Sequence, residues 1–295
     1  MVPRCASRVA CRLDVGTSET SAIEQWAESG GLRLTWSAAA SLGSVIWPQT
    51  LKRLIFSSDM LVTAATWPAS LQQLSFGGDF NKSIAEEVPI VGAVWPTSLQ
   101  QLSFGDAFNQ PIVGAVWPSS LQELSFGDAF NEPIVGAVWP VSLQELWFGH
   151  AFNQPIVGAP ASLQQLSFEG NFNLPIAEVR WPASLQRLSF GYSFNQPIVG
   201  VVWPSSLQRL SLGREFDQHI VGVVWSASLQ QLSFGYYFNQ TIIGVIWPAS
   251  VQQLSFGYSF NQPIAEVVRP ASVQQLSFGS SFNQPIAEVV WPTSL

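Results

Sequence analysis

Apolar and polar residues alternate in a short segment that recurs along most of the chain. In Leu71–Phe76, LQQLSF, the apolar Leu74 and Phe76 are separated by a polar residue, and Gly77 follows. A period of two is typical of a β-strand with one buried face. The segment therefore predicts a short strand, with leucine and phenylalanine inward and glutamine and serine outward.

The other half of each repeat has a different composition. Pro133–Pro140, PIVGAVWP, is rich in proline, glycine and β-branched residues, which disfavour a helix. A Phe-Asn pair, such as Phe80-Asn81, lies between the strand and this return segment and marks a bend. We expect the return segment to be extended and to close one coil of chain.

The same unit recurs from Trp47 to the C-terminus, and most copies begin 22 residues apart with a Trp-Pro pair. A fixed period of this length indicates a solenoid, in which each repeat is one coil stacked on the next. A lone coil buries too little apolar surface to offset the entropy of ordering it, so contacts between coils must stabilise the fold. The predicted fold class is mostly β, with a short parallel strand per coil and few helices. The solenoid spans 47–295 in roughly ten to eleven coils and ends mid-repeat.

Residues 1–46 do not show the repeat clearly. Ser21 and Glu24 have the spacing of a helix capping box, and Ile23 and Trp26 lie on one helical face. We expect an irregular N-terminal segment with a short helix that covers the first coil. At the other end, Leu295 falls five residues into a repeat. An open strand edge there predicts self-association, or else that the chain is a fragment of a longer protein.

An asparagine recurs at the bend of nearly every coil. Its side chain is predicted to lie inside the coil and to bond backbone groups of adjacent coils. The positions, with Asp217 in one coil, are Asn81, Asn109, Asn131, Asn153, Asn173, Asn195, Asn239, Asn261 and Asn283. A residue repeated in each coil favours a structural role over a binding role. Two N-glycosylation sequons, at Asn81 and Asn239, use these residues and are therefore interpreted as accidental.

The repeat resembles the FNIP repeats, a family of leucine-rich-repeat-like units. Leu99–Ile112 carries the pattern Leu-Gln-Gln-Leu-Ser-Phe-Gly-x-x-Phe-Asn-Gln-Pro-Ile, which recurs about ten times within Trp47–Leu295. One copy departs from the pattern, with Leu212, Asp217 and His219 in place of Phe, Asn and Pro. The resemblance implies a leucine-rich-repeat-like solenoid that serves as an interaction scaffold.

Composition restricts the function. Only 11% of residues are charged and the net charge is −7, which argues against a nucleic-acid partner. No apolar run has the length of a membrane span. The two cysteines, Cys5 and Cys11, lie outside the repeats, which favours a reducing compartment. The expected location is therefore cytoplasmic.

The chain contains no recognisable catalytic or metal-binding motif. Its two histidines, His150 and His219, fall at non-equivalent positions of different repeats, with no cysteine near them in sequence. The recurring serines have no base beside them. We therefore predict a protein without enzymatic activity, cofactor or metal.

Variation between the copies is concentrated in two rows of outward positions. One row lies on the strands and the other just beyond them, and the two are predicted to lie side by side. The strand row reads Gln101, Glu123, Glu145, Gln165, Arg187, Arg209 and Gln231. The second row reads Asp106, Asp128, His150, Gly170, Tyr192, Arg214, Tyr236 and Tyr258. The face thus changes along the chain from acidic to arginine and tyrosine, and Trp147 adds an aromatic in a serine position.

Arginine and tyrosine are enriched at the hot spots of protein interfaces. The predicted partner-binding residues are Arg187, Tyr192, Arg209, Arg214, Tyr236, Tyr237 and Tyr258. A secondary acidic face comprises Asp106, Glu123, Asp128 and Glu145, where stacked like charges favour a bound partner. The preferred function is an intracellular protein-interaction scaffold. The alternative is a surface or extracellular adhesion protein that binds glycans. A solvated surface that varies without function would give the same rows.

Overall fold

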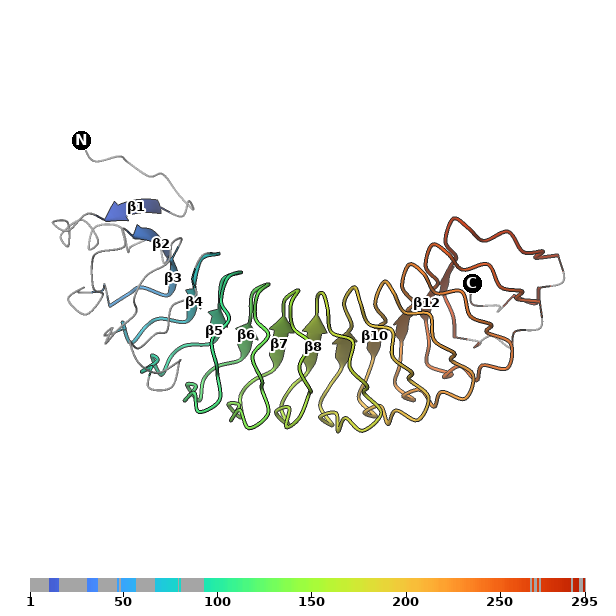
Figure 1. Ribbon diagram of the computed structural model, residues 1–295, viewed down its shortest axis with the longest axis horizontal. Coiled ribbons are helices and arrows are strands. Elements are labelled where there is room, and N and C mark those ends of the chain that lie inside the picture. The colour runs from blue at the N-terminus through green and yellow to red at the C-terminus, as the bar shows by residue number, and fades with distance from the viewer. Residues whose placement is uncertain are drawn as a thin grey trace. The chain divides into compact units, whose positions relative to one another are not determined.

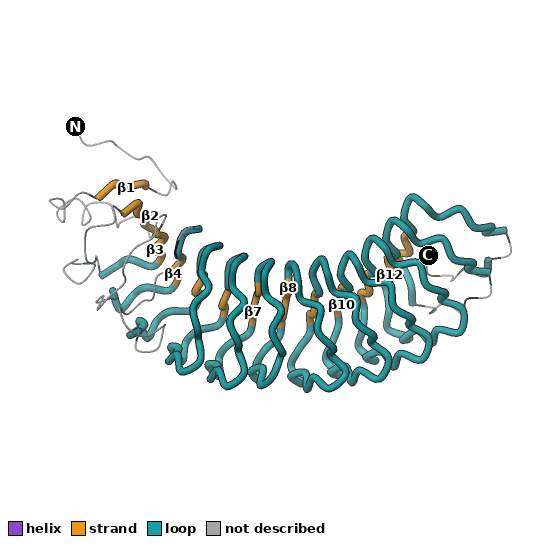
Figure 2. Tube along the Cα trace, in the orientation of Figure 1, coloured by secondary structure: helices purple, strands orange, loops and turns teal. Residues whose placement is uncertain are grey.

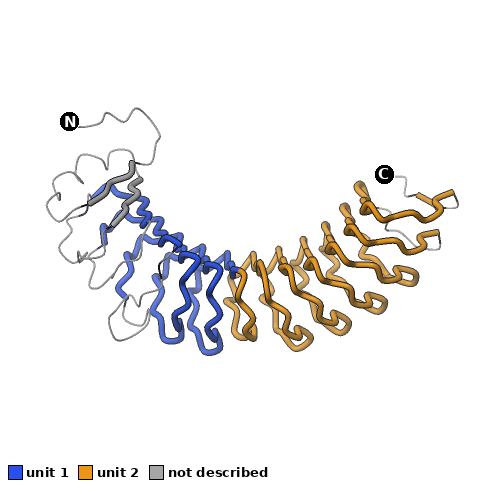
Figure 3. The backbone as a smooth tube through the Cα atoms, turned by 45° about the horizontal axis from the view of Figure 1, so that its top comes forward, with its two compact units in different colours: residues 1–149 blue, residues 150–295 orange. Residues whose placement is uncertain are grey.

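The computed structural model describes most of the repeats and two strands that precede them. The described residues are 11–15, 31–36, 47, 49–56, 67–78, 80, 93–265, 267, 270, 272–287, 289–291 and 294. They form two compact units, Met1–Gly149 and His150–Leu295 (Figure 3). Figure 2 draws strands and loops but no helix in the described residues, so none of these residues provides a membrane-spanning helix. The helix expected near Ser21 lies outside the described residues.

The strands of unit 1 are short and pair in parallel in the order of the sequence. They are β1 (Cys11–Val15), β2 (Gly31–Trp36), β3 (Arg53–Phe56), β4 (Gln73–Ser75), β5 (Gln101–Ser103), β6 (Glu123–Ser125) and β7 (Glu145–Phe148). Equivalent residues are register partners, as Leu74 is with Leu54 and Leu102. The predicted strand at Leu74 is confirmed, and each coil contributes one strand to the ladder.

Unit 2 repeats the same arrangement (Figure 1). Its strands are β8 (Gln165–Phe168), β9 (Arg187–Ser189), β10 (Arg209–Ser211), β11 (Gln231–Ser233), β12 (Gln253–Ser255) and β13 (Gln275–Ser277). They too pair in parallel and in sequence order. Among the described residues no strand follows β13, and Leu276 and Phe278 are only half-buried. Self-association at this edge stays a prediction.

Turns rather than a second sheet return the chain across each coil. In the coil of β6 they are closed by backbone hydrogen bonds from Leu121 to Pro118, from Phe130 to Gly127 and from Ala137 to Ile134. Gly136 in the last of these turns has φ of 88°, in the left-handed region that strains a residue with a Cβ atom. The glycine of the return segment is therefore a requirement of this turn.

The core of each unit consists of ladders of apolar side chains that continue from coil to coil. Phe126 stacks on Phe130 of its own coil with 4.1 Å between ring centroids, and on Phe104 of the preceding coil at 5.6 Å. The tryptophans of the Trp-Pro pairs form a separate ladder, with 6.3 Å between Trp95 and Trp117. Because the ladders continue through neighbouring coils, stability depends on the stacking of coils, as the solenoid interpretation predicts.

A serine ladder, which the sequence analysis did not identify, also joins the coils. Ser120 Oγ donates a hydrogen bond to the carbonyl oxygen of Leu99 in the preceding coil, at 2.6 Å. Equivalent bonds are made by Ser70, Ser98, Ser142, Ser184, Ser206, Ser250, Ser272 and Ser294. The repeated Ser-Leu pair therefore satisfies a carbonyl at the start of each strand segment.

Candidate protein-interaction site

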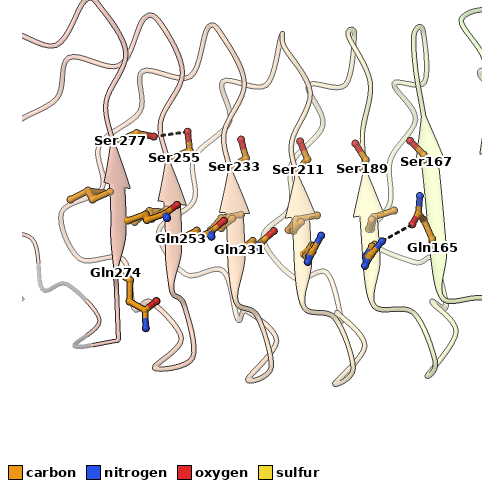
Figure 4. A pocket seen from close by; sticks show the side chains of 18 of the residues that line it. Gln165, Ser167, Ser189, Ser211, Gln231, Ser233, Gln253, Ser255, Gln274 and Ser277 are labelled. Atoms are coloured by element: carbon orange, nitrogen blue, oxygen red, sulfur yellow. Dashed lines mark hydrogen bonds between the residues drawn. The ribbon is translucent and has the colours of Figure 1, made fainter. Parts of the chain in front are cut away.

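The outward side chains of β8–β13 line a groove on unit 2. Its volume is about 840 Å³, and glutamine, arginine and serine side chains alternate with leucines along its lining. In Figure 4 the glutamines Gln165, Gln231 and Gln253 mark one row, and serines from Ser167 to Ser277 form a second row. Register pairing places one side chain of each row on every strand. The serine row is uniform, so only the glutamine row varies.

Two arginines replace glutamine at adjacent steps of that row. Arg187 and Arg209 are register partners in β9 and β10, so their backbones are about 4.8 Å apart. Both are exposed, and Nη1 of Arg187 donates to Oε1 of Gln165 at 3.3 Å. No carboxylate occurs among the described residues that line the groove. Like charges on adjacent strands repel each other, which favours an anion beside them.

The second row of unit 2 is a stack of tyrosine rings and one arginine. Cζ of Arg214 lies 4.8 Å from the ring centroid of Tyr192 and 4.8 Å from that of Tyr236. Tyr236 in turn stacks on Tyr258, with 4.7 Å between centroids and 5° between ring planes. Tyr237 packs against Tyr236 at 4.8 Å and a steep angle of 69°. All four tyrosines are exposed.

The groove and the tyrosine–arginine stack are separate features of unit 2. The groove lining includes Arg187 and Arg209 but neither Arg214 nor any of the tyrosines. The stack lies three residues beyond the ends of the strands, as Tyr192 follows Ser189. The sequence prediction places the arginines and tyrosines in one set of partner-binding residues. It misses that Arg214 is held between rings, because that contact depends on the register of adjacent coils.

Unit 1 carries the acidic part of the strand row. Glu123 is the register partner of Gln101 on one side and of Glu145 on the other, as the spacing predicts. A groove of about 300 Å³ on this unit includes Arg53, Glu123 and Trp147 in its lining. Its lining is therefore mixed in charge, whereas the larger groove of unit 2 has arginine alone.

The second row of unit 1 is acidic as well. Asp106 and Asp128 are exposed at equivalent positions of consecutive coils. The backbone N–H of Ala129 donates to the carbonyl oxygen of Asp106 at 2.7 Å, which holds one turn against the next. Unit 1 thus presents carboxylates where unit 2 presents arginine and tyrosine.

The prediction that the recurring asparagines lie inside the coil is wrong. Their side-chain oxygens do accept backbone N–H groups of the next coil, as Asn195 Oδ1 does from Asp217 at 2.9 Å. The residues are nevertheless half-buried or exposed, because an oxygen directed along the stacking axis needs no burial to reach that N–H. Asn239 is exposed, so burial gives no reason to dismiss its sequon. Asn81 lies outside the described residues.

The two histidines of unit 2, His150 and His219, lie in different coils. Nδ1 of His150 and Oε2 of Glu169 are 4.0 Å apart, and both side chains are exposed. His219 is exposed in another coil.

Three solved structures resemble the chain. CroV588, described as a novel circular LRR protein, is 38% identical with a TM-score of 0.75, and the match covers 89% of this chain and 42% of CroV588. An internalin, InlF of Listeria monocytogenes, is 12% identical with a TM-score of 0.54, over 95% of this chain and 88% of the internalin. YopM of Yersinia enterocolitica is 15% identical with a TM-score of 0.49, over 93% and 69%. The match thus spans less than half the length of CroV588.

No curated protein sequence matches the chain. The model of the FNIP repeat matches seven segments, which overlap through unit 2: 89–129, 152–193, 172–215, 194–236, 216–259, 238–268 and 260–295. These segments cover more than half of the chain and contain the strands β5, β6 and β8–β13. The chain belongs to the FNIP repeat family.

Proposed function

We propose that the protein is an interaction scaffold and that the groove on β8–β13 binds an acidic, extended segment of a partner protein. The observation that carries the proposal is the groove of about 840 Å³ with Arg187 and Arg209 in register and no carboxylate in its lining. Solenoids present extended surfaces made of many repeats, and such surfaces suit an extended segment.

The charges of the groove favour a carboxylate-bearing or phosphorylated segment. Arg187 and Arg209 project from adjacent strands, and an anion between them removes the repulsion that they otherwise exert. The guanidinium fork forms two hydrogen bonds to a carboxylate or a phosphate. The glutamine and serine side chains on either side supply neutral hydrogen-bonding groups for the backbone of the bound segment.

The alternative function, glycan binding through aromatic residues, is disfavoured by the tyrosine stack. A sugar that stacks on an aromatic ring needs a free ring face. Both faces of Tyr236 are covered, one by Arg214 at 4.8 Å and the other by Tyr258 at 4.7 Å. Tyr236 is therefore not available for stacking on a sugar, and we favour a protein partner. The acidic net charge of −7 argues against a nucleic acid.

We infer a binding protein that needs no cofactor and catalyses no reaction, because the described polar side chains that line the groove are amides, hydroxyls and guanidinium groups without a nucleophile–base pair. The only two cysteines in the sequence, Cys5 and Cys11, lie outside the repeats. Repeats without cysteine support a cytoplasmic location.

Selection from a displayed library of random peptides tests the proposal. We expect the selected peptides to be enriched in aspartate and glutamate, and the double variant Arg187→Gln/Arg209→Gln to lose this enrichment. Arg180→Gln is a matched control, because Arg180 is exposed outside the groove. Selection of the same peptides by the protein and by the double variant would contradict the proposal.

A further inference from the structure

The guanidinium group of Arg214 is held between two tyrosine rings on the surface of unit 2. Its Cζ atom is 4.8 Å from the ring centroids of both Tyr192 and Tyr236, and 5.7 Å from that of Tyr237. With a ring on either side, the edge of the guanidinium plane remains for further contacts, and this edge carries its five N–H donors. Contact with aromatic faces contributes about 0.5–1 kcal/mol at an exposed site and uses none of these donors.

The polar groups of the stack have no partner within the described part of the chain. Arg214 forms no ion pair or hydrogen bond with any described residue, although Glu215 and Asp217 are close in sequence. The hydroxyl groups of Tyr192, Tyr236 and Tyr258 likewise form no hydrogen bond with a described residue. Guanidinium and phenol donors are thus gathered on one exposed stack over four consecutive coils.

From this arrangement we propose that the Tyr192–Arg214–Tyr236 stack is a receptor for an oxyanion, either a carboxylate or a phosphate group. Arginine binds both groups through two parallel N–H···O bonds. The ring centroids of Tyr192 and Tyr236 lie 4.8 Å from Cζ of Arg214. A hydroxyl group of these rings is a further donor for a remaining oxygen of the same anion.

The backbone beneath the stack is fixed by hydrogen bonds between coils. The N–H of Glu215 donates to the carbonyl oxygen of Tyr192 at 2.9 Å, and the N–H of Tyr237 donates to that of Arg214 at 3.0 Å. The N–H of Ser259 donates to the carbonyl oxygen of Tyr236 at 2.9 Å. The backbone that carries the receptor is therefore fixed before an anion binds, which lowers the entropy cost of binding.

This receptor is independent of the proposed groove, because no residue of the stack lines the groove. A purely structural role is the main competing explanation, in which the rings and Arg214 only stabilise the outer turns. The two explanations predict different effects of Arg214→Lys, a substitution that keeps the positive charge and removes the planar guanidinium fork. A structural cation–π contact tolerates lysine better than a bidentate receptor does.

Nuclear magnetic resonance of the arginine Nε–H groups of the full chain tests the proposal. The signal of Arg214 is assigned by its absence in Arg214→Gln. The probes are inorganic phosphate and three peptides of one sequence that carry phosphoserine, glutamate or glutamine at a single position. We expect the Arg214 signal to shift, with a shift that saturates, when phosphate or the phosphoserine or glutamate peptide is added. The signal should not move with the glutamine peptide.

Affinity measurements on variants complete the test. We expect the charged peptide to bind about tenfold more weakly to both Arg214→Gln and Arg214→Lys, since charge-assisted bonds to the fork are lost, and to bind Arg180→Gln normally. Preference for the phosphoserine or the glutamate peptide identifies the source of the oxyanion. An Arg214 signal that does not move with any probe would overturn the proposal, as would unchanged affinity in Arg214→Lys. A loss of binding in Arg187→Gln/Arg209→Gln alone would assign the peptide to the groove and also overturn it.

Discussion

Oδ1 of Asn109 accepts a hydrogen bond from the backbone N–H of Asn131, 2.8 Å away in the next coil. The same bond joins Asn195 to Asp217 and Asn239 to Asn261 in unit 2. One side-chain oxygen per coil thus accepts a hydrogen bond from a backbone N–H at the bend of the next coil. The asparagine does so although its side chain lies at the surface of its own coil. This placement sets how much each asparagine can contribute to stability.

We predict that Asn195→Ala lowers the free energy of unfolding by about 1 kcal/mol. The backbone N–H of Asp217 and the side chain of Gln218 both lose their acceptor, at 2.9 and 3.0 Å, but water can reach the half-buried site and replace it in part. Chemical denaturation measures the loss. Gln240→Ala is the control, since Gln240 is half-buried at the position after an asparagine and forms no hydrogen bond with a described residue. Equal losses in the two variants would contradict a structural asparagine ladder.

The glycine just after a strand, such as Gly235, should tolerate substitution far less than the glycine of the return turn. A Cβ atom on Gly235 would lie 1.7 Å from the carbonyl oxygen of Gly213, so the two coils would have to separate. A Cβ on Gly222 meets nothing within 4 Å and costs only the strain of its φ of +88°. We expect Gly235→Ala to lower stability by at least about 3 kcal/mol and Gly222→Ala by about 1–2 kcal/mol. Thermal melts of both variants check the order, and a larger loss at Gly222 would refute this account of coil spacing.

The phenylalanine ladder of unit 2 has one gap that can be filled. Leu212 occupies a phenylalanine position and is buried. The rings of Phe216 and Phe234 are tilted by 33°, whereas the equivalent angle between Phe238 and Phe256 is 21°. We interpret the extra tilt as adjustment to the smaller leucine. Leu212→Phe should therefore raise stability by about 1 kcal/mol. A lower melting temperature would show that the neighbouring rings have already closed the space.

Glu123 should destabilise unit 1 through its charge. It lies in register with Glu145, about 4.8 Å away along the sheet, and directly opposite like charges are unfavourable. At low ionic strength, Glu123→Gln should raise the free energy of unfolding by up to about 1 kcal/mol. The melting temperature should rise with it. The gain should fall in 1 M salt, where the screening length is about 3 Å. Glu132→Gln makes the same charge change away from the strand row, and an equal gain there would contradict a specific repulsion.

The sequence predicts the solenoid well because its signals are local and repeated. Alternation at Leu74 and Phe76 identifies the strand, and the constant period places equivalent residues in register. The serine ladder is harder to identify, since Ser120 acts on Leu99 of another coil and the residue type alone does not show the bond. The exposure of Asn195 is missed for a related reason: a recurring polar residue indicates a structural bond but not the depth at which it forms.

The candidate site is predicted in part. The period correctly stacks Arg187 on Arg209 and places Arg214 in a row with Tyr236. It does not show that the strand row forms a groove while the second row forms a separate stack, because that depends on where the chain turns after each strand. The sandwich of Arg214 between rings depends on side-chain conformation, which a pattern of residue types does not specify.

The central claim is that the groove of unit 2 binds an acidic segment through Arg187 and Arg209. The most direct test is the dissociation constant of one selected acidic peptide, measured by calorimetry from low to high salt. We predict that binding to the unmodified protein and to Arg180→Gln weakens steeply with salt. Arg187→Gln/Arg209→Gln should bind about tenfold more weakly at low salt and show little salt dependence. If the double variant instead gives the same dissociation constants as the unmodified protein at every salt concentration, the groove is not the binding site.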